Sequence, residues 1–479
     1  MRLSELFREV EFDGSIKNDA DINFVTDDSR LVRPGSLFVC IRHRSFDGHT
    51  AALDALASGA AAVVTQDRLG LENELHVADS RAAYARLCAA LCGHPERKLR
   101  MIGVTGTNGK TTVTTLIRNI LSDSGAKTLL TGTVCNRLGD ENLPSGLTTP
   151  KPPELYSLLS RAVSQGCKVC VMEASSQALA QGRLEGIDFD AAVFTNITRD
   201  HLDYHGTFEN YLSAKKKLFE HSAVSIVNLD DPRADEIIAA AKGKIITFST
   251  VLDCADYTAK NISLLSDRVH FELISKGHIE HIEFASPGLF SVSNAMAAVA
   301  CAINLGIEPK DAAQSLAKSK SVCGRLERVE CSAPYSVIID YAHTPDALEN
   351  VLNAIHEVLN GKGQVITVCG AGGNRDKGKR PLMAQEAVKQ SDKVIITSDN
   401  PRFEEPQDII NDMLAGLNAQ QMKKVISIVD RREAIRTACM MAQKGDVVLI
   451  AGKGHENYQD VKGVKHHFDD HEVVREVCS

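Results

Sequence analysis

With 479 residues, the chain is too long for one hydrophobic core, and about two to four domains are expected. Its composition, 43% hydrophobic and 24% charged, is typical of a globular protein, and the net charge of −8 argues against a nucleic-acid-binding surface. Residues 1–6 are too polar for a signal peptide, and no apolar run reaches the roughly 18 residues of a membrane span. We therefore expect a cytoplasmic protein whose 13 cysteines are reduced.

Residues 1–98 have the pattern of a small mixed α/β domain. Apolar runs at 35–41 and 61–64 predict strands, and residues 50–58 between them predict a helix. No repeat or low-complexity linker separates this part from the next.

A glycine-rich turn at residues 103–111, Gly-Val-Thr-Gly-Thr-Asn-Gly-Lys-Thr, lies between an apolar run and a helical pattern. Backbone N–H groups and the positive helix end face an anion in such a turn, Lys110 can reach terminal phosphates, and Thr111 can offer its hydroxyl to Mg²⁺. The loop is shorter than a Walker A motif, because Val104 stands at the position of its first glycine. A turn that merely joins a strand to a helix is the alternative, but such turns rarely end in Lys-Thr-Thr. The sequence predicts a nucleotide triphosphate site.

Residues 99–324 alternate apolar runs with amphipathic helices, which predicts a parallel sheet covered on both faces. The expected strands are 168–172, 191–195, 224–228 and 245–248, and the expected helices include 153–165 and 208–221. Residues 257–284 alternate like strands without helices, so we expect an antiparallel addition there.

Polar residues follow several of these strands, where open α/β sheets place their ligands. Glu173 ends one strand and is a candidate Mg²⁺ ligand, although an acid at a helix N-terminus is the alternative. The polar loop 195–205 favours a site, but His201 taken alone is more typical of a surface histidine. The lysines 215–217 lie on an amphipathic helix and are expected to form its solvated face.

Residues 325–479 have the pattern of a doubly wound, Rossmann-like domain, with expected strands at 337–340, 365–369, 394–397, 425–428 and 447–451. Polar loops at 370–380, 399–402 and 452–456 each follow a strand, so they should converge on one small ligand with two charges. A nucleotide site flanked by two other domains suggests a cleft that closes on its substrate.

Together these motifs resemble the Mur ligases of bacterial cell-wall synthesis, and within them the members that add the third residue of the peptide. The resemblance extends from Asp28-Ser29-Arg30 to residues 452–456, and the loop 106–112 is also shared by folylpolyglutamate synthases. It implies three domains, 1–98 for the UDP-muramoyl substrate, 99–324 for ATP and 325–479 for the amino acid.

The resemblance also implies site residues. Catalytic roles fall to Lys110, His201 and Lys215. ATP would be held by Gly106, Thr107, Asn108, Gly109, Lys110, Thr111, Thr112, Asn294, Arg325 and Asp340. The UDP-muramoyl-dipeptide would be held by Ser29, Arg44, Ser45, Phe46, Thr148, Thr149, Ser175, Gln181 and Arg183. The added amino acid would be held by Arg375, Asp399, Asn400, Pro401, Arg402, Gly452 and Glu456. Mg²⁺ would be bound by Thr111, Glu173, His201 and a CO₂-derived carbamate on Lys215.

The implied activity is the ATP-dependent ligation of meso-2,6-diaminopimelate to UDP-N-acetylmuramoyl-L-alanyl-D-glutamate through an acyl phosphate, by a monomer. Arg402 favours diaminopimelate over L-lysine, because its planar guanidinium suits the second carboxylate. Two positions depart from the family pattern: Gln177, commonly histidine, and His43, where glycine is expected.

Alternative functions remain. L-lysine is the first alternative as the added amino acid. A folylpolyglutamate-synthase-like ligase would not need residues 1–98, and a regulatory relative without turnover would be expected to lack Lys110, Glu173 or His201.

Overall fold

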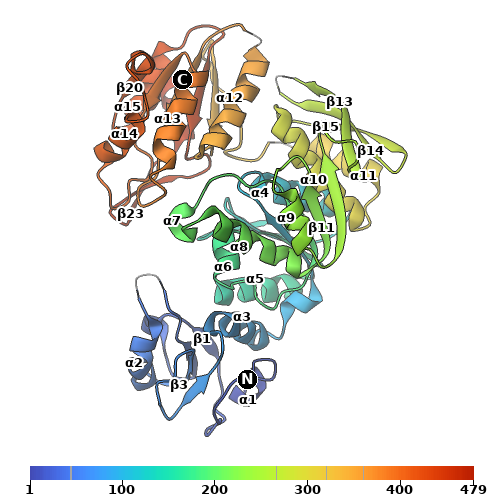
Figure 1. Cartoon of the computed structure of the whole chain (residues 1–479), viewed down its shortest axis with the longest axis vertical. Helices are drawn as coiled ribbons and strands as arrows, with labels where there is room; N and C mark the ends of the chain where they lie inside the picture. Colours follow the sequence, from blue (N-terminus) through green and yellow to red (C-terminus); the bar gives the residue numbers. More distant parts are fainter. Residues whose placement is uncertain (44–45, 266, 320, 360, 479) are drawn as a thin grey trace.

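The computed structural model describes residues 1–43, 46–265, 267–319, 321–359 and 361–478. Its three main sheets occupy successive parts of the sequence, with the N-terminal part (blue) and the C-terminal part (orange to red) at opposite ends of the middle part (Figure 1). None of the helices in the described ranges combines the length and hydropathy that a membrane crossing requires.

The N-terminal sheet is parallel throughout, in the order β1-β2-β3-β4. Its strands are β1 (Phe24–Thr26), β2 (Ser36–Val39), β3 (Ala60–Thr65) and β4 (Glu74–His76), and its helices include α1 (Leu3–Leu6), α2 (Ala52–Ala57) and α3 (Ser80–Leu91). Asp79 caps α3 by accepting hydrogen bonds from the N–H groups of Arg81 and Ala82. The strands predicted at 35–41 and 61–64 and the helix predicted at 50–58 are confirmed.

The middle sheet has eleven strands in the order β15-β14-β13-β12-β11-β10-β5-β9-β6-β7-β8. The strands are β5 (Arg100–Thr105), β6 (Thr128–Thr131), β7 (Asn136–Leu138), β8 (Glu141–Leu143), β9 (Val169–Glu173), β10 (Phe189–Phe194), β11 (Ser222–Asn228), β12 (Lys244–Ser249), β13 (Tyr257–Leu264), β14 (Val269–Ser275) and β15 (His278–Phe284). From β6 to β13 neighbouring strands are parallel, whereas β14 and β15 are antiparallel additions at one edge. The predicted parallel sheet with an antiparallel addition is confirmed.

Helices cover both faces of the middle sheet. The first face carries α4 (Lys110–Asp123), α10 (Leu289–Asn304) and α11 (Pro309–Lys318), whose apolar residues share one core. The second face carries α5 (Pro152–Ser164), α6 (Ser176–Ala180), α8 (Phe208–Glu220) and α9 (Ala234–Ala240), and the short α7 (Leu202–His205) follows β10. The second core continues into α3, where Tyr84 and Leu87 belong to the same apolar cluster as Leu155 and Leu159 of α5. The N-terminal and middle parts therefore share one core.

The C-terminal sheet has the order β16-β17-β21-β18-β19-β20 and is parallel except for β16. Its elements are β16 (Glu327–Val329), β17 (Ser336–Asp340), α12 (Pro345–Leu359), β18 (Val365–Cys369), α13 (Lys379–Gln390), β19 (Lys393–Ile396), α14 (Pro406–Leu414), β20 (Val425–Ser427), α15 (Arg431–Met441), β21 (Val447–Ala451), the hairpin β22 (Tyr458–Val461) with β23 (Val464–His467), and α16 (Asp470–Cys478). Residues of α12, α13 and α14 form one core, and residues of α15 and α16 form another on the opposite face. The doubly wound prediction is confirmed.

Candidate active site

The glycine-rich loop joins β5 to α4 and packs tightly against two neighbouring segments. A Cβ atom added at Gly106 would clash with Thr195 Oγ1, and one at Gly109 would clash with Asn294 Oδ1. Gly109 also has a φ of 84°, a left-handed conformation that glycine adopts without strain. The loop is thus held open at the N-terminus of α4, which is the geometry of an anion site.

Two lysines converge on the carbonyl oxygen of Gly106. Lys110 Nζ donates to it over 2.9 Å and to the Thr107 carbonyl over 2.8 Å, while Lys215 Nζ donates to the same Gly106 oxygen over 2.7 Å. Desolvation lowers the pKa of Lys110. The pKa of Lys215 is well below its usual value, mainly because of desolvation and secondly because the Lys110 charge repels an ammonium there.

Lys215 is buried, which contradicts the expectation that lysines 215–217 form a solvated face. Its exposed fraction is 1%, whereas Lys217 is exposed. The reason is helical spacing: Lys215 lies four residues after Tyr211 and four before Phe219, so all three side chains point to the buried face of α8. Its ammonium position lies 4.6 Å from the centroid of the Tyr211 ring.

A pocket lies between the phosphate loop and the C-terminal part. Six of the residues expected to hold ATP line it: Asn108, Gly109, Thr112, Asn294, Arg325 and Asp340. Arg325 crosses to the middle part, where Nη2 donates to Thr111 Oγ1 over 3.1 Å. Its guanidinium carbon also lies 4.6 Å from the centroid of the Tyr341 ring. Gly106, Thr107 and Lys110 form the adjoining loop rather than the pocket lining.

Sequence reasoning missed the apolar lining of this pocket. It comes from several segments of the chain and follows no local motif: Phe284, Phe290, Val322, Ala342, and Ala347 and Val351 of α12. Among the other lining residues, Tyr341 could have been suspected from the sequence, since it directly follows Asp340. Burial raises the pKa of Asp340, whose carboxylate accepts hydrogen bonds from the Leu326 and Ala342 N–H groups. Asp340 thereby fixes the loop next to Arg325.

Glu173 is buried at the end of β9 and contacts the loop after β6. Its Oε1 accepts a hydrogen bond from the Thr133 N–H over 2.7 Å, and its Oε2 accepts one from the Thr133 hydroxyl over 2.9 Å. The same hydroxyl lies 3.1 Å from Thr148 Oγ1. Thr133 was not identified from the sequence, because it belongs to no recognised motif.

The other dipeptide-binding candidates of the middle part form one network. Thr149 Oγ1 lies 3.0 Å from Ser175 Oγ, and the Thr149 carbonyl accepts a hydrogen bond from Arg183 Nη1 over 2.7 Å. Gln181 Oε1 accepts two hydrogen bonds from the Arg183 guanidinium. Gln177 is half-buried on α6.

The N-terminal candidates lie on loops of the first sheet. Ser29 is half-buried, and Phe46 is exposed. Arg44 and Ser45 lie outside the described residues. His43 Nε2 is 3.4 Å from an Asp27 carboxylate oxygen, which Lys151 Nζ approaches to 3.3 Å from the loop after Thr149. Asp27 therefore connects the first sheet with the dipeptide network.

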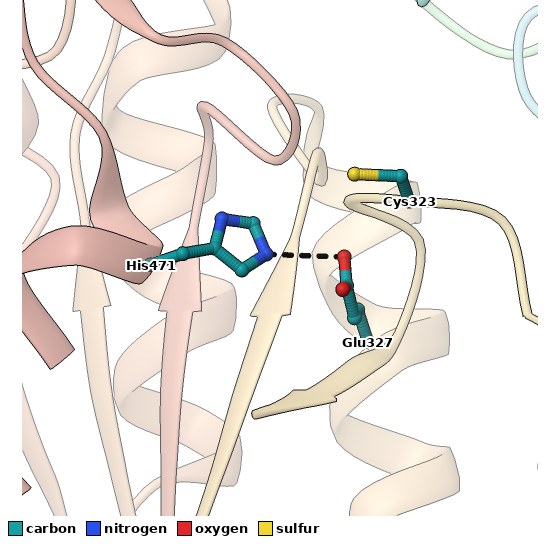
Figure 2. Close-up of side chains that lie close together, drawn as sticks. All are labelled: Cys323, Glu327 and His471. Carbon is teal, nitrogen blue, oxygen red and sulfur yellow. Dashed lines mark hydrogen bonds and ion pairs between the residues drawn. The ribbon is translucent and has the colours of Figure 1, made fainter. Parts of the chain in front are cut away.

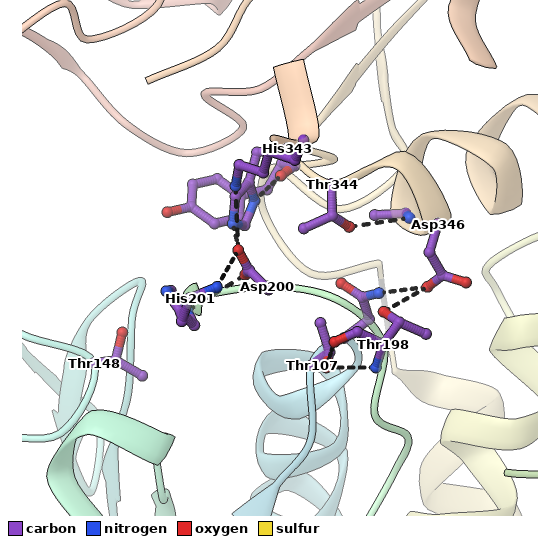
Figure 3. Close-up of polar contacts among 12 residues, drawn as sticks. Thr107, Thr148, Thr198, Asp200, His201, His343, Thr344 and Asp346 are labelled. Carbon is purple, nitrogen blue, oxygen red and sulfur yellow. Dashed lines mark hydrogen bonds and ion pairs between the residues drawn. The ribbon is translucent and has the colours of Figure 1, made fainter. Parts of the chain in front are cut away.

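His201 lies at the junction of the middle and C-terminal parts, where Figure 3 shows it beside Asp200. Its Nε2 is 3.3 Å from Asp200 Oδ2, yet burial lowers the pKa of the imidazole to about 3, so the ring is neutral at physiological pH. Burial opposes the charge of Asp200, but Lys379 at 3.2 Å and His343 at 3.7 Å outweigh it and hold the pKa of that carboxyl well below its usual range.

Further polar contacts cross the same junction, and Figure 3 shows one of them, between Thr198 and Asp346. Asn108 of the phosphate loop donates to Asp346 Oδ2 over 2.8 Å, and Arg199 Nε donates to Asp376 Oδ2 over 3.2 Å. Asp346 was not identified from the sequence. Lys379 stood inside the recognised loop 370–380, but its pairing with Asp200 was not predicted, because that partner lies in another part of the chain.

Three loops of the C-terminal sheet converge as predicted. Asn400 Nδ2 donates to Glu456 Oε2 over 2.7 Å, and the buried Lys453 Nζ lies within 3.2 Å of both side chains. Gly452 approaches so close that a Cβ would lie 2.7 Å from Asp399 Oδ2. Lys453 stood inside the recognised 452–456 motif, yet only the structure indicates its role as the counter-charge of Glu456.

Two arginines flank the loop 370–380 of the C-terminal part, next to these residues. Arg402 has a φ of 52° after the buried Pro401, and its Nη1 donates to the Gly373 carbonyl over 2.8 Å. A Cβ at Gly372 would contact both Arg402 Nη1 and Arg375 Cγ, so the two side chains flank one loop. Arg375 is exposed, and Arg402 is half-buried.

Two of the donors expected to hold Mg²⁺ fit that ion in kind, the buried carboxylate of Glu173 and the hydroxyl of Thr111. The neutral His201 imidazole would add a nitrogen donor, which suits Mg²⁺ less well than oxygen. Lys215 fits only after modification, since an amine offers no oxygen, and its lowered pKa favours the uncharged amine that reacts with CO₂.

Family models match nearly the whole chain. The Mur ligase family catalytic domain matches residues 21–89, the Mur ligase middle domain matches 104–302, and the Mur ligase glutamate ligase domain matches 324–454. The chain belongs to the Mur ligase family. This confirms the resemblance to Mur ligases and the predicted fold class.

Several full-length relatives of this Mur ligase carry one name, UDP-N-acetylmuramoyl-L-alanyl-D-glutamate–2,6-diaminopimelate ligase. The protein of that name from Phocaeicola vulgatus is 49% identical over 486 residues, which cover 100% of this chain and 99% of the relative. Its namesake from Bacteroides fragilis is 48% identical over 493 residues, with coverage of 100% and 99%.

Solved structures agree with this family assignment. A structure with the same name has a TM-score of 0.71 and 36% identity, and the match covers 100% of this chain and 98% of that one. A folylpolyglutamate synthase from Mycobacterium tuberculosis, complexed with ADP and AMPPCP, has a TM-score of 0.64 at 17% identity, which shows the shared fold. It covers only 78% of this Mur ligase, so part of the chain has no counterpart there.

Proposed function

We propose that this Mur ligase uses ATP to join meso-2,6-diaminopimelate to UDP-N-acetylmuramoyl-L-alanyl-D-glutamate. The observation that carries the proposal is the pocket in which the phosphate loop meets Arg325 and Asp340 of the C-terminal part. A nucleotide held there would contact the phosphate loop on one side and the C-terminal part on the other. The name shared by full-length relatives at 48–49% identity supports both substrates.

Each of the three parts would bind a different substrate. In this proposal, residues 1–98 bind the UDP-muramoyl end of the substrate, residues 99–324 bind ATP, and residues 325–479 bind the amino acid. The enzyme would act as a cytoplasmic monomer, which sedimentation of the purified protein would test.

The chemistry follows from the weak electrophilicity of a carboxylate. The γ-phosphoryl group of ATP passes to a carboxylate oxygen of the D-glutamyl residue, which yields an acyl phosphate and ADP. The amine of diaminopimelate then attacks the acyl carbon and loses a proton, and phosphate leaves with the electron pair of the broken C–O bond. Lys110 would stabilise the charge on the transferred phosphoryl group, and the two substrate-binding parts would supply proximity.

The proposed reaction also requires Mg²⁺ and a carbamate on Lys215. When bound, Mg²⁺ supplies positive charge beside the phosphates, and Thr111, Glu173 and His201 would hold it. Lys215 would complete the set as a carbamate, formed when its neutral amine attacks CO₂ and gives up a proton. The burial of Lys215 and the lowered pKa of its amine support this modification.

Selection of the amino acid is proposed to depend on Arg402. Its guanidinium would bind the distal carboxylate of diaminopimelate, and Glu456 would pair with the accompanying ammonium. Glu456 already lies 3.1 Å from Lys453, so the incoming ammonium would share it with that lysine.

Phosphate release tests the proposal directly. Purified enzyme receives the UDP-muramoyl-dipeptide, ATP and Mg²⁺, with diaminopimelate, lysine or ornithine in turn. We expect release with diaminopimelate and little with the other two. Equal release with lysine would contradict the proposed specificity, and release with a folate in place of the dipeptide would contradict the proposed acceptor.

A further inference from the structure

A second cluster of ligand-type side chains lies outside the active site, where the middle part connects to the C-terminal sheet (Figure 2). Cys323, Glu327 and His471 each offer one ligand atom, and the three atoms lie within 4.8 Å of one another. Cys323 and Glu327 belong to the segment that leads into β16, whereas His471 lies in the first turn of α16. The cluster therefore joins two distant segments of the chain.

The His471 ring is oriented by a carboxylate that is not part of the cluster. Its Nδ1 lies 3.1 Å from Asp469 Oδ1, and its Nε2 lies 3.1 Å from Glu327 Oε2. Asp469 is itself fixed, because the same oxygen accepts the His471 backbone N–H over 2.7 Å. A carboxylate on one imidazole nitrogen sets the tautomer and presents the other nitrogen to a metal, as in many protein zinc sites.

A comparison within the chain shows why this cluster is the better candidate. Asp47, His49 and Asp67 also form a group of possible ligands. There, however, His49 Nε2 accepts backbone N–H groups of Gln66 and Asp67 over 3.1 and 3.3 Å, while Nδ1 faces Asp47. Backbone N–H groups thus occupy the acceptor position of His49, whereas His471 Nε2 faces the potential ligand Glu327 instead.

We propose that Cys323, Glu327 and His471 bind a transition-metal dication of the zinc class. Thiolate, imidazole and carboxylate are ligands that zinc accepts together, and the exposed side of Cys323 leaves space for a water as fourth ligand. Mg²⁺ prefers oxygen ligands only, so the magnesium of the ligase reaction does not compete for this site.

Metal binding would be coupled to proton release. The ligands bind in their deprotonated forms, so a bound dication takes the place of the Cys323 thiol proton and of any proton on the His471 nitrogen that faces Glu327. Both protons pass to the solvent.

Metal binding would act on the loop that carries Arg325. Glu327 Oε2 also accepts the Gly324 N–H over 2.7 Å, and Arg325 reaches from this loop to Thr111. A metal at Glu327 would hold the loop more rigidly beside the nucleotide pocket.

Cobalt substitution tests the site. Reduced, chelator-treated protein is titrated with Co²⁺ and followed by its absorption spectrum. We expect a thiolate-to-cobalt charge-transfer band that saturates at one equivalent and disappears on adding Zn²⁺ but not Mg²⁺. Cys323→Ser should lose the band, and His471→Gln should weaken cobalt binding at least about tenfold.

Cys254→Ser is the matched control, because Cys254 is also exposed but lies outside the cluster. It should keep the band. Circular dichroism and thermal unfolding in chelator check that each variant is folded. The proposal is overturned if the wild type shows no such band, or if Cys323→Ser keeps it at full intensity.

Discussion

Lys110 and Lys215 donate to the same oxygen, the Gly106 carbonyl, yet their surroundings suit different chemistry. Lys110 is half-buried at the N-terminus of α4, where a nucleotide phosphate would meet it. Lys215 is fully buried beside Tyr211, where an ammonium is costly and an uncharged amine is favoured. In the proposed function, Lys110 would therefore serve as a cation and Lys215 as a nucleophile toward CO₂.

Lys110→Ala should abolish ligation and leave the fold intact. The side chain contributes charge at the phosphate loop rather than to either apolar core, so activity should fall at least about a thousandfold. Single-turnover assays measure the loss, and circular dichroism checks the fold. Full activity of the variant would contradict the phosphate-loop interpretation.

Lys215→Ala should be nearly inactive and partly rescued by short carboxylates, which replace the missing carbamate oxygens. Labelled bicarbonate should give a carbamate carbon signal in NMR spectra of the wild type but not of the variant. Lys216→Ala is the matched control, because Lys216 is only half-buried and pairs with Glu236. Wild-type activity of Lys215→Ala would refute the carbamate.

Arg402→Ala should lose most diaminopimelate ligation while weak lysine activity is kept or rises. Loss of a charged hydrogen bond costs about 2–4 kcal/mol, roughly 30- to 1,000-fold in selectivity. Competition between the two amino acids at equal concentration measures the ratio. Arg436→Ala is the control and should keep the wild-type ratio, since Arg436 is exposed on α15 and pairs with Glu433. A wild type that used both amino acids equally would contradict the argument.

At the scale of single residues, the sequence predicted site residues that belong to a recognisable motif. It did not predict those whose role depends on contacts with distant residues. The phosphate loop and Asn400, Glu456 and Arg402 were predicted because each follows a strand in a recognisable pattern. Thr133 was missed, and so was the pairing of Lys379 with Asp200, because both contacts are made with residues distant in the chain. The burial of Lys215 could have been derived, since four-residue spacing from Tyr211 places it on the apolar face.

At the scale of elements, α16 is attached to the beginning of the C-terminal sheet by the Glu327–His471 pair. Strand positions were predictable because buried parallel strands are continuous apolar runs, as at 365–369 and 447–451. The position of β21 between β17 and β18 was not predictable, since apolar runs do not encode which strands are neighbours.

The Glu327–His471 pair makes the stability of the contact between α16 and the C-terminal sheet depend on pH. Glu327 has a lowered pKa, so its contribution is present above about pH 4.5 and is lost as the pH falls toward 2. His471 has a raised pKa, so its contribution is present below about pH 6.5 and is lost as the pH rises through the folded value. The pair should therefore stabilise the fold most between these limits.

His471→Ala should thus destabilise the metal-free protein by about 1 kcal/mol more at pH 6 than at pH 9. Urea unfolding followed by circular dichroism in chelator measures the difference. His467→Ala is the control, because its bond to Glu472 is exposed and should contribute little. An equal loss at both pH values would refute the ion-pair explanation.

At the scale of the whole molecule, the two junctions differ in kind. The N-terminal and middle parts share a continuous apolar core through α3 and α5. The middle and C-terminal parts have separate cores. They meet through polar contacts such as Asn108–Asp346 and Lys379–Asp200, and the apolar contact across the junction comes from Phe290 of α10, which packs against the C-terminal core. Polar contacts are exchangeable with water, so domain movement is expected at the second junction.

Lys379→Met should weaken closure at this junction, because it leaves the buried Asp200 without its nearest cation. We expect a larger radius of gyration in X-ray scattering and a KM for ATP raised by roughly 10- to 100-fold. Lys377→Met is the control, since Lys377 is exposed and pairs with Glu404 within its own part. Unchanged scattering and KM would show that the pair does not control closure.

The unequal junctions also bear on how new specificities arise. Because the cores of residues 325–479 are separate from those of the remainder apart from the contact with Phe290, this segment can be exchanged between relatives with little repacking of the apolar interior. Recombination near Gly324 would transfer the proposed amino-acid site in one step and keep the acceptor site, provided that the incoming segment keeps the side of the nucleotide pocket that Arg325 and Asp340 form. Diversity in the third position of the peptide would then spread by the shuffling of modules as readily as by point mutation.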